Sequence, residues 1–180
     1  MLRSIALAAA LAPLPALADE CYSVDAAHGS VRYEVKQAGS AFRGAFRRFG
    51  GEICLAADRA TRIEVWLDPA SADSGLPEID AALKGEEFFA VERYPRVAYA
   101  SRSIELRGTA QLAHGTLQMK GQRRDLDALF NLRRDSGVPV VSGTLAINRL
   151  DYGIGTGEWS NTNWLGGEVK IDFEATLSRR

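Results

Sequence analysis

The chain has 180 residues, of which 46% are apolar, and its 22 basic and 23 acidic side chains give a formal net charge of −1. This composition is typical of one soluble globular domain and excludes a disordered chain. Because basic and acidic residues are interspersed, no basic field is present that would gather nucleic acid or an anionic membrane surface.

The first eighteen residues have the features of a cleaved secretory signal. Arg3 provides a positive charge, residues 4–17 are almost wholly apolar, and residues 16–18 (ALA) offer the small side chains that a signal peptidase requires. The apolar stretch is shorter than the roughly 20 residues of a spanning helix. We predict cleavage after Ala18 and an exported domain at residues 19–180, the alternative being an uncleaved anchor.

Export changes the interpretation of the two cysteines, Cys21 and Cys54. In an oxidising compartment an even number of cysteines usually indicates a bridge. We therefore predict a disulfide that joins the start of the exported domain to a strand. The alternative is a pair of buried thiols.

Alternation of apolar and polar residues dominates the exported domain. It is strict at residues 31–37 and recurs at residues 62–68 and 169–174, and this period of two is typical of strands that are buried on one face. Weaker copies occupy residues 52–55, 97–101, 104–106, 116–120, 126–132 and 140–148. Glycine-rich turns separate these segments at the short spacing of an antiparallel all-β domain.

One segment, residues 77–84, has the features of a short helix. Pro77 lies near its start, acidic residues follow, and Lys84 and Gly85 end it. The roughly eight strands must bury their apolar faces by pairing two sheets or by closing one sheet into a barrel, and the pattern leaves both open. An eight-stranded barrel is just wide enough to be filled by side chains or to hold one slender ligand.

Catalytic motifs are scarce. His28 and His114 lack the spacing of zinc ligands, and no nucleophile elbow is present. The glycines of residues 153–157 resemble a phosphate-binding loop in composition only, because no helix follows them. We predict no catalytic residue, no metal and no cofactor, and we keep an enzyme as a third hypothesis.

Aromatic residues are more informative. Two groups, residues 42–49 and 88–89, could cap the end of an apolar cavity or close an ordinary core over the mouth of a barrel. Trp66 falls on the polar face of its strand, which predicts a position outside the barrel, under a loop or at a partner surface.

Five motifs in the same order resemble the YceI-like family. They are residues 25–31 (DAAHGSV), 42–51 (FRGAFRRFGG), 88–95 (FFAVERYP), 115–121 (GTLQMKG) and 147–159 (INRLDYGIGTGEW). The resemblance spans about residues 22–177, which is nearly the whole exported domain. It departs from the family pattern at Ala82 and Lys120, where the family often has histidines.

The resemblance implies an extended, eight-stranded, antiparallel, lipocalin-like barrel in the bacterial periplasm that holds a long isoprenoid, such as a polyprenyl phosphate or a quinone. Lys120 is then a candidate for contact with the head group. The inward-facing residues expected to contact the lipid are Val31, Tyr33, Val35, Phe42, Phe46, Phe49, Ile63, Val65, Leu67, Phe89, Val97, Tyr99, Leu117, Met119, Phe130, Leu145, Ile147, Ile171 and Phe173.

Two functional hypotheses follow. The first is a non-catalytic periplasmic carrier or scavenger of an isoprenoid lipid. The second is a periplasmic stress or electron-transport accessory that acts on an inner-membrane partner protein through its outer surface, at Trp66 and residues 153–164, with any lipid incidental. Whether two copies form a homodimer stays open.

Overall fold

The computed structural model describes residues 19–179, so the predicted signal peptide lies outside the described residues. The strands are β1 (Glu20–Gln37), β2 (Ser40–Phe46), β3 (Phe49–Ala56), β4 (Arg59–Leu67), β5 (Ala72–Asp73), β6 (Val97–Arg107), β7 (Ala110–Met119), β8 (Gln122–Asp135), β9 (Val138–Asn148) and β10 (Leu165–Arg179). The helical segments are α1 (Pro77–Lys84) and the 3₁₀ turns η1 (Pro69–Ser71), η2 (Arg149–Tyr152) and η3 (Gly157–Ser160).

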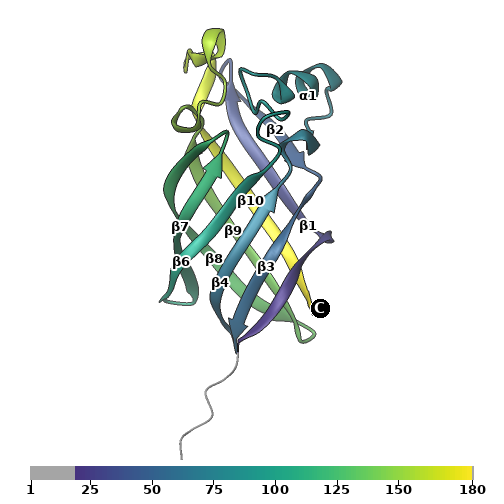
Figure 1. Cartoon of the computed structure of the whole chain (residues 1–180), viewed down its shortest axis with the longest axis vertical. Helices are drawn as coiled ribbons and strands as arrows, with labels where there is room; N and C mark the ends of the chain where they lie inside the picture. Colours follow the sequence, from purple (N-terminus) through teal and green to yellow (C-terminus); the bar gives the residue numbers. More distant parts are fainter. Residues whose placement is uncertain (1–18, 180) are drawn as a thin grey trace, which may run out of the picture.

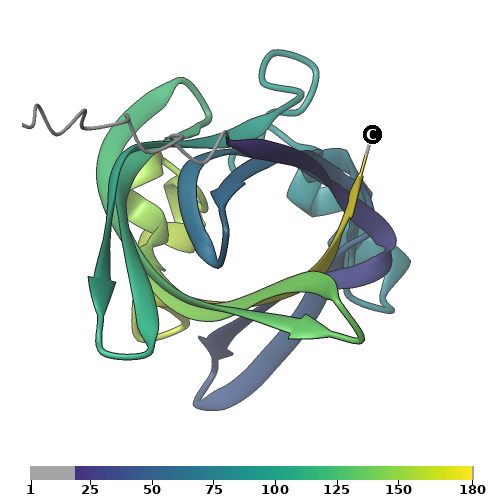
Figure 2. The same cartoon turned by 90° about the horizontal axis from the view of Figure 1, so that it is seen from below.

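Eight long strands close into an antiparallel barrel, which confirms the predicted fold class. Their order around the barrel is β1, β3, β4, β6, β7, β8, β9 and β10, and β10 pairs with β1 to complete the ring (Figure 1). Viewed from below, the strands surround a common axis (Figure 2). Because the sheet is closed, the apolar face of each strand is turned toward the interior of the barrel.

Strand β1 is longer than its sequence pattern predicts. The alternation begins at Val31, whereas the strand begins at Glu20, and a register shift between Asp25 and Gly29 interrupts its pairing with β10. Its first part pairs with β3 and its second part with β2. This bulge interrupts the alternation of apolar and polar residues, so the sequence pattern did not predict the first part of β1 as a strand.

Two further differences have similar causes. Strand β2 was expected to be a connection, but Phe42, Gly44 and Phe46 all face inward, and the glycine removes the middle member of the apolar pattern. Strand β6 was expected as two segments, but it is continuous, with a register shift between Ser101 and Ser103. Both are local irregularities in a pattern that is otherwise followed.

Helix α1 spans the predicted residues and lies at one end of the barrel, within the connection between β5 and β6 (Figure 1). Pro77 occupies its first turn, and the Gly85 backbone N–H donates to the carbonyl of Ala82 at its end. Within residues 19–179, no helix has the length and the apolar composition to cross a membrane.

The interior contains two groups of buried apolar side chains, one toward each end of the barrel. The packed end lies away from α1 and includes Tyr22, Leu55, Phe130 and Leu177. The loop end lies under α1 and the turns η2 and η3, and its buried residues are Val35, Phe88, Val97, Leu117, Met119, Ile147, Tyr152, Ile154 and Leu165.

Candidate functional site

An internal cavity of about 310 Å³ lies inside the barrel. This volume is at the lower end of the roughly 300–1,000 Å³ that small-molecule sites occupy. All of the inward-facing residues predicted above, from Val31 on β1 to Phe173 on β10, line the cavity. The period of two therefore identified the wall correctly, while contact of these residues with a lipid stays a prediction.

The cavity wall also contains residues that the strand pattern did not select. Ile79, Ala82 and Leu83 line it from α1, and Phe88 and Trp159 line it from the loops. The rings of Phe88 and Trp159 are in contact, with centroids 5.6 Å apart. A helical period could have identified the α1 residues, since 79, 82 and 83 share one face of a helix.

The two aromatic groups singled out in the sequence meet at the loop end. The ring of Phe46 lies 5.4 Å from that of Tyr33 and 5.8 Å from that of Phe89, in an edge-to-face arrangement with Phe89. Phe42, Phe46, Phe49, Phe88 and Phe89 all line the cavity, and this geometry favours their interpretation as its cap. Aromatic rings so arranged form an apolar rim of defined shape.

Three inward-facing rings lie flat against the barrel wall because a glycine stands beneath each. A Cβ added to Gly44 would lie 2.3 Å from the Tyr33 hydroxyl, and one added to Gly115 would lie 2.4 Å from the Tyr99 ring. A Cβ on Gly143 would lie 2.6 Å from the ring of Phe173. The absent side chains keep these rings out of the middle of the cavity.

Arg149, on η2, is 2% exposed and lies beside the cavity. A guanidinium has five N–H donors, and here each donates to a backbone carbonyl at 2.6–2.8 Å. The acceptors are Ile154, Gly155, Trp159, Leu165 and Gly166. Burial lowers the pKa of Arg149, and the ring of carbonyls offsets the cost of its charge. Arg149 thus fixes the loop between η2 and β10.

Lys120, the head-group candidate, is placed at the rim and does not line the cavity among the described residues. Its Nζ donates to the carbonyls of Glu86 and Gly153, both at 2.7 Å. Partial burial lowers the pKa of its ammonium group. The lysine joins two loops of the loop end, and its contact with a ligand head group stays a prediction.

Two tyrosine hydroxyls face different surroundings in the same wall. The Tyr99 hydroxyl donates to the carbonyl of Ala113 at 3.0 Å and lies 3.3 Å from that of Leu126. The Tyr33 hydroxyl is buried, and within residues 19–179 it is the fully buried side-chain polar atom that has no hydrogen-bond partner. Burial raises the pKa of both phenols to about 12.

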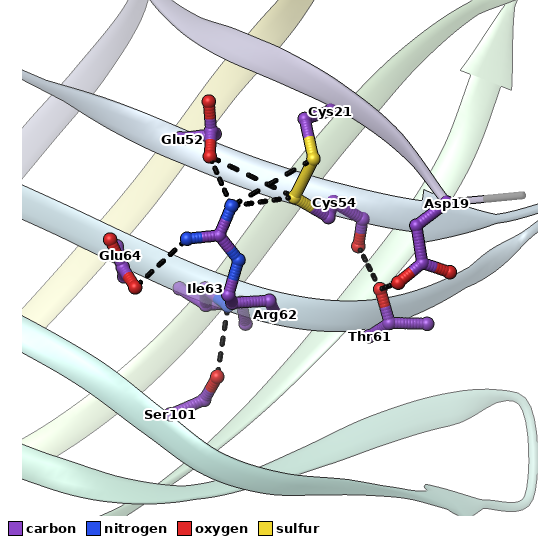
Figure 3. The surroundings of a disulfide bond; sticks show 9 residues. All are labelled: Asp19, Cys21, Glu52, Cys54, Thr61, Arg62, Ile63, Glu64 and Ser101. Atoms are coloured by element: carbon purple, nitrogen blue, oxygen red, sulfur yellow. Dashed lines mark hydrogen bonds and ion pairs between the residues drawn. A yellow bond between two sulfur atoms is a disulfide. The ribbon is translucent and has the colours of Figure 1, made fainter.

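The predicted disulfide is confirmed, since Cys21 on β1 and Cys54 on β3 are bonded at directly paired positions (Figure 3). The guanidinium of Arg62 lies beside it, with Nη2 3.2 Å from the Cys54 sulfur and an ion pair to Glu52. Cys21, Cys54 and Glu52 are close enough for a metal site, but the disulfide uses both sulfur atoms.

The histidines lie apart from the cavity. His28 is exposed and bonds Asp25 at 2.9 Å, whereas His114 lies on the outer face between Asp127 at 2.8 Å and Glu105 at 3.4 Å. These carboxylates raise the pKa of His114. Neither histidine has a nucleophile or a cavity beside it that would make it a catalytic base.

Trp66 is half-buried on β4, and the guanidinium of Arg96 lies 4.4 Å from the centroid of its ring. Arg96 belongs to the segment that leads into β6, so a loop residue covers one face of the indole, in a cation–π contact. This leaves a smaller apolar surface for a partner protein, and a partner at Trp66 stays a prediction.

Comparison with known proteins gives a single family. A family model described as a YceI-like domain matches residues 22–177. A UPF0312 protein of Shewanella putrefaciens is 30% identical over 64% of this chain and 63% of its own length, so the match covers less than two thirds of that relative.

Solved structures share the fold. The crystal structure of Burkholderia cenocepacia BcnA has a TM-score of 0.81 and 26% identity, over 85% of this chain and 98% of that one. A structure described as a polyisoprenoid binding domain from Saccharophagus degradans has a TM-score of 0.70 and 17% identity, over 88% of this chain and 98% of that one.

Proposed function

The chain belongs to the YceI-like family, and from this premise we propose that it binds an isoprenoid lipid inside its barrel as a carrier or scavenger. The observation that carries the proposal is the cavity of about 310 Å³, whose wall consists almost wholly of apolar side chains from every barrel strand and from α1. The description of the Saccharophagus degradans domain as polyisoprenoid-binding supports the same class of ligand.

The physical basis of retention is the burial of the isoprenoid tail. Transfer of apolar surface out of water contributes about 25 cal/mol per Å², or about 0.8 kcal/mol for each buried methylene. Such binding needs no hydrogen bonds along the tail. Ligand specificity therefore depends on the length of the cavity and on the few polar groups in it. Membership of the YceI-like family and the apolar wall of the cavity support a binding protein over an enzyme.

The direction of entry follows from the difference between the two ends. At the packed end Leu55 and Leu177 are only 1% exposed, and strands surround them on all sides. At the loop end the closure consists of α1 and of loops that Lys120 and Arg149 hold through backbone carbonyls. Loops separate more readily than paired strands, so we place the portal at the loop end.

We place the protein in the periplasm. The features of the first eighteen residues and the Cys21–Cys54 disulfide support export, because disulfides persist in oxidising compartments. In that compartment a carrier would shield an isoprenoid tail from water between membrane surfaces.

The test is to purify residues 19–180, extract the protein with organic solvent and identify bound lipid by mass spectrometry. Uptake of added quinone and polyprenol is then measured with two tryptophan variants of adjacent residues on β9. Leu145 lines the cavity and Ala146 is exposed, so Leu145→Trp should abolish uptake while Ala146→Trp should retain it. An absence of both bound lipid and uptake in the unmodified protein would refute the proposal.

A further inference from the structure

The polar groups beside the cavity differ in whether the protein already satisfies them. All five donors of Arg149 are bonded to carbonyls, and the hydroxyl of Tyr99 is bonded to Ala113. Within the described chain, the hydroxyl of Tyr33 is buried without such a partner. A buried hydroxyl without a partner is destabilising, so its presence in a native protein needs an explanation, and an oxygen of a bound ligand is one such explanation.

The position of Tyr33 lies on the path that a ligand would take from the loop end. Its ring lines the same cavity as Ile79, Ala82 and Leu83 of α1, and it stacks against the rim residue Phe46. The ring rests on Gly44, whose absent side chain lets it lie along the wall, and it has to turn away from Gly44 to present its hydroxyl to a ligand. Turning breaks no hydrogen bond of the hydroxyl, because none is present.

The surrounding charges determine which kind of ligand oxygen suits this hydroxyl. Burial, with smaller contributions from Asp80 of α1 and Asp73 of β5, raises the pKa of Tyr33 to about 12, so the phenol keeps its proton at physiological pH. Asp73 is ion-paired with Arg47 at 2.7 Å, so the carboxylate that opposes an anion at this position is Asp80, which accepts from the neutral Ser74 hydroxyl. A phosphate there would meet this negative charge and a single neutral donor.

Among the residues that the structure describes, no cation that lines the cavity has a free donor to compensate that repulsion. The charged residues that line it, within residues 19–179, are Arg149 and Glu174. Arg149 has no donor left, and Glu174 is itself negative. Lys120 lies outside the lining, and two of its three N–H donors are bonded to carbonyls of the loop end.

We propose that the Tyr33 hydroxyl is the polar anchor of the cavity and that it forms a hydrogen bond with an uncharged oxygen, a carbonyl or a hydroxyl, of the bound isoprenoid. This inference rests on the proposed function and narrows it to uncharged isoprenoids such as polyprenols and quinones. Tyr99 is the matched control, because it also lies over a glycine in the same wall but has its own acceptor.

The experiment uses residues 19–180 and three ligands with one tail: a polyprenol, its monophosphate and the corresponding hydrocarbon. Dissociation constants are measured for the unmodified protein, Tyr33→Phe and Tyr99→Phe, with thermal melts to verify folding. Loss of one neutral hydrogen bond should weaken polyprenol binding by Tyr33→Phe about three- to tenfold and leave hydrocarbon binding unchanged. Tyr99→Phe should affect alcohol and hydrocarbon alike, and the unmodified protein should prefer the alcohol to the phosphate.

The failures of the two proposals can be distinguished. If the unmodified protein binds the tails but Tyr33→Phe weakens alcohol and hydrocarbon equally, or neither, the anchor is refuted while the lipid-binding function stands. Preference of the unmodified protein for the phosphate refutes the anchor as well. If none of the three ligands binds, the proposed function fails, and the anchor fails with it.

Discussion

The two ends of the barrel are built from the same strands but by different means. At the packed end, Leu55 and Leu177 fill the interior and the Cys21–Cys54 disulfide joins β1 to β3. The cavity, whose lining reaches Ile53 and Phe130 of the packed end, is closed at the loop end by α1 and by loops. The comparison teaches that a single closed sheet can be completed by packed side chains and a disulfide at one end and by a helix and loops at the other.

Each end also has a buried polar side chain that fixes backbone. At the packed end the amide of Gln111, 4% exposed, donates to the Asp58 carbonyl at 3.0 Å and accepts from the Ala60 N–H at 2.9 Å. At the loop end Arg149 fixes the longer segment that precedes β10. Gln111 thus holds a tight turn between two strands, whereas Arg149 organises a loop that has no sheet of its own.

The largest expected effect contrasts side chains at the packed end and in the cavity wall. Leu177→Ala should lower the free energy of unfolding by about 3–5 kcal/mol, because it creates a void among filled neighbours. Leu145→Ala faces space that already exists and should cost about 1–2 kcal/mol, mainly the lost transfer free energy. Urea denaturation of residues 19–180 measures both. Equal losses would show that the two ends are packed alike.

The disulfide should matter next, and only for the packed end. Its cysteines are 33 residues apart, so replacing both by serine should lower the free energy of unfolding by roughly 3–4 kcal/mol. Ligand uptake below the midpoint of unfolding should stay within about twofold of the unmodified protein, as the bond lies at the packed end, beside Tyr22 and Leu55. A strong loss of uptake in the folded variant would contradict the separation of the two ends.

The two wall tyrosines should respond with opposite signs. Tyr99→Phe removes a satisfied hydroxyl and should lower the free energy of unfolding by about 0.5–1.5 kcal/mol. Tyr33→Phe removes an unsatisfied one and should leave the lipid-free protein as stable or more stable by up to about 1 kcal/mol. Chemical denaturation after delipidation is the measurement, and destabilisation by both variants would contradict it.

The smallest effect concerns pH and the outer face. Asp127 and Glu105 raise the pKa of His114 above its ordinary value of 6.5, so its imidazolium stabilises the fold fully below that value. The contribution is lost as the pH rises through the raised folded pKa. The Tm difference between the unmodified protein and His114→Gln should therefore be larger at about pH 6 than at about pH 9. The reverse trend would contradict this account.

The barrel wall could be predicted from the sequence because strand alternation is a local property. Within five positions, the alternation identifies Val31, Tyr33 and Val35 as one apolar face, and closure of the sheet turns that face inward. Helix α1 was equally accessible, since Pro77 and Gly85 mark its ends. The first part of β1 and the whole of β2 were missed where a bulge or a glycine interrupts the pattern.

The polar groups of the site could not be predicted in this way. Arg149 finds its acceptors between residues 154 and 166, on loops without periodic sequence, so its burial depends on the folded arrangement. Lys120 became a head-group candidate because it stands where the related family often has a histidine; its two bonds to carbonyls depend on the folded loops, and its contact with a head group stays a prediction. The Tyr99 hydroxyl has backbone carbonyls within hydrogen-bonding distance, whereas the Tyr33 hydroxyl has none. The alternation of apolar and polar residues in the sequence cannot predict this difference.

The glycines beneath Tyr33, Tyr99 and Phe173 give the barrel its bore. Gly44, Gly115 and Gly143 leave room for rings to lie along the wall, and one methyl group at any of them would tilt a ring into the lumen. The width of the lumen thus depends on three residues that have no side chain. Alanine at one, two or three of these positions would give a graded set of narrower barrels that share every other wall residue, a molecular gauge for the thickness of the guest that this fold accepts.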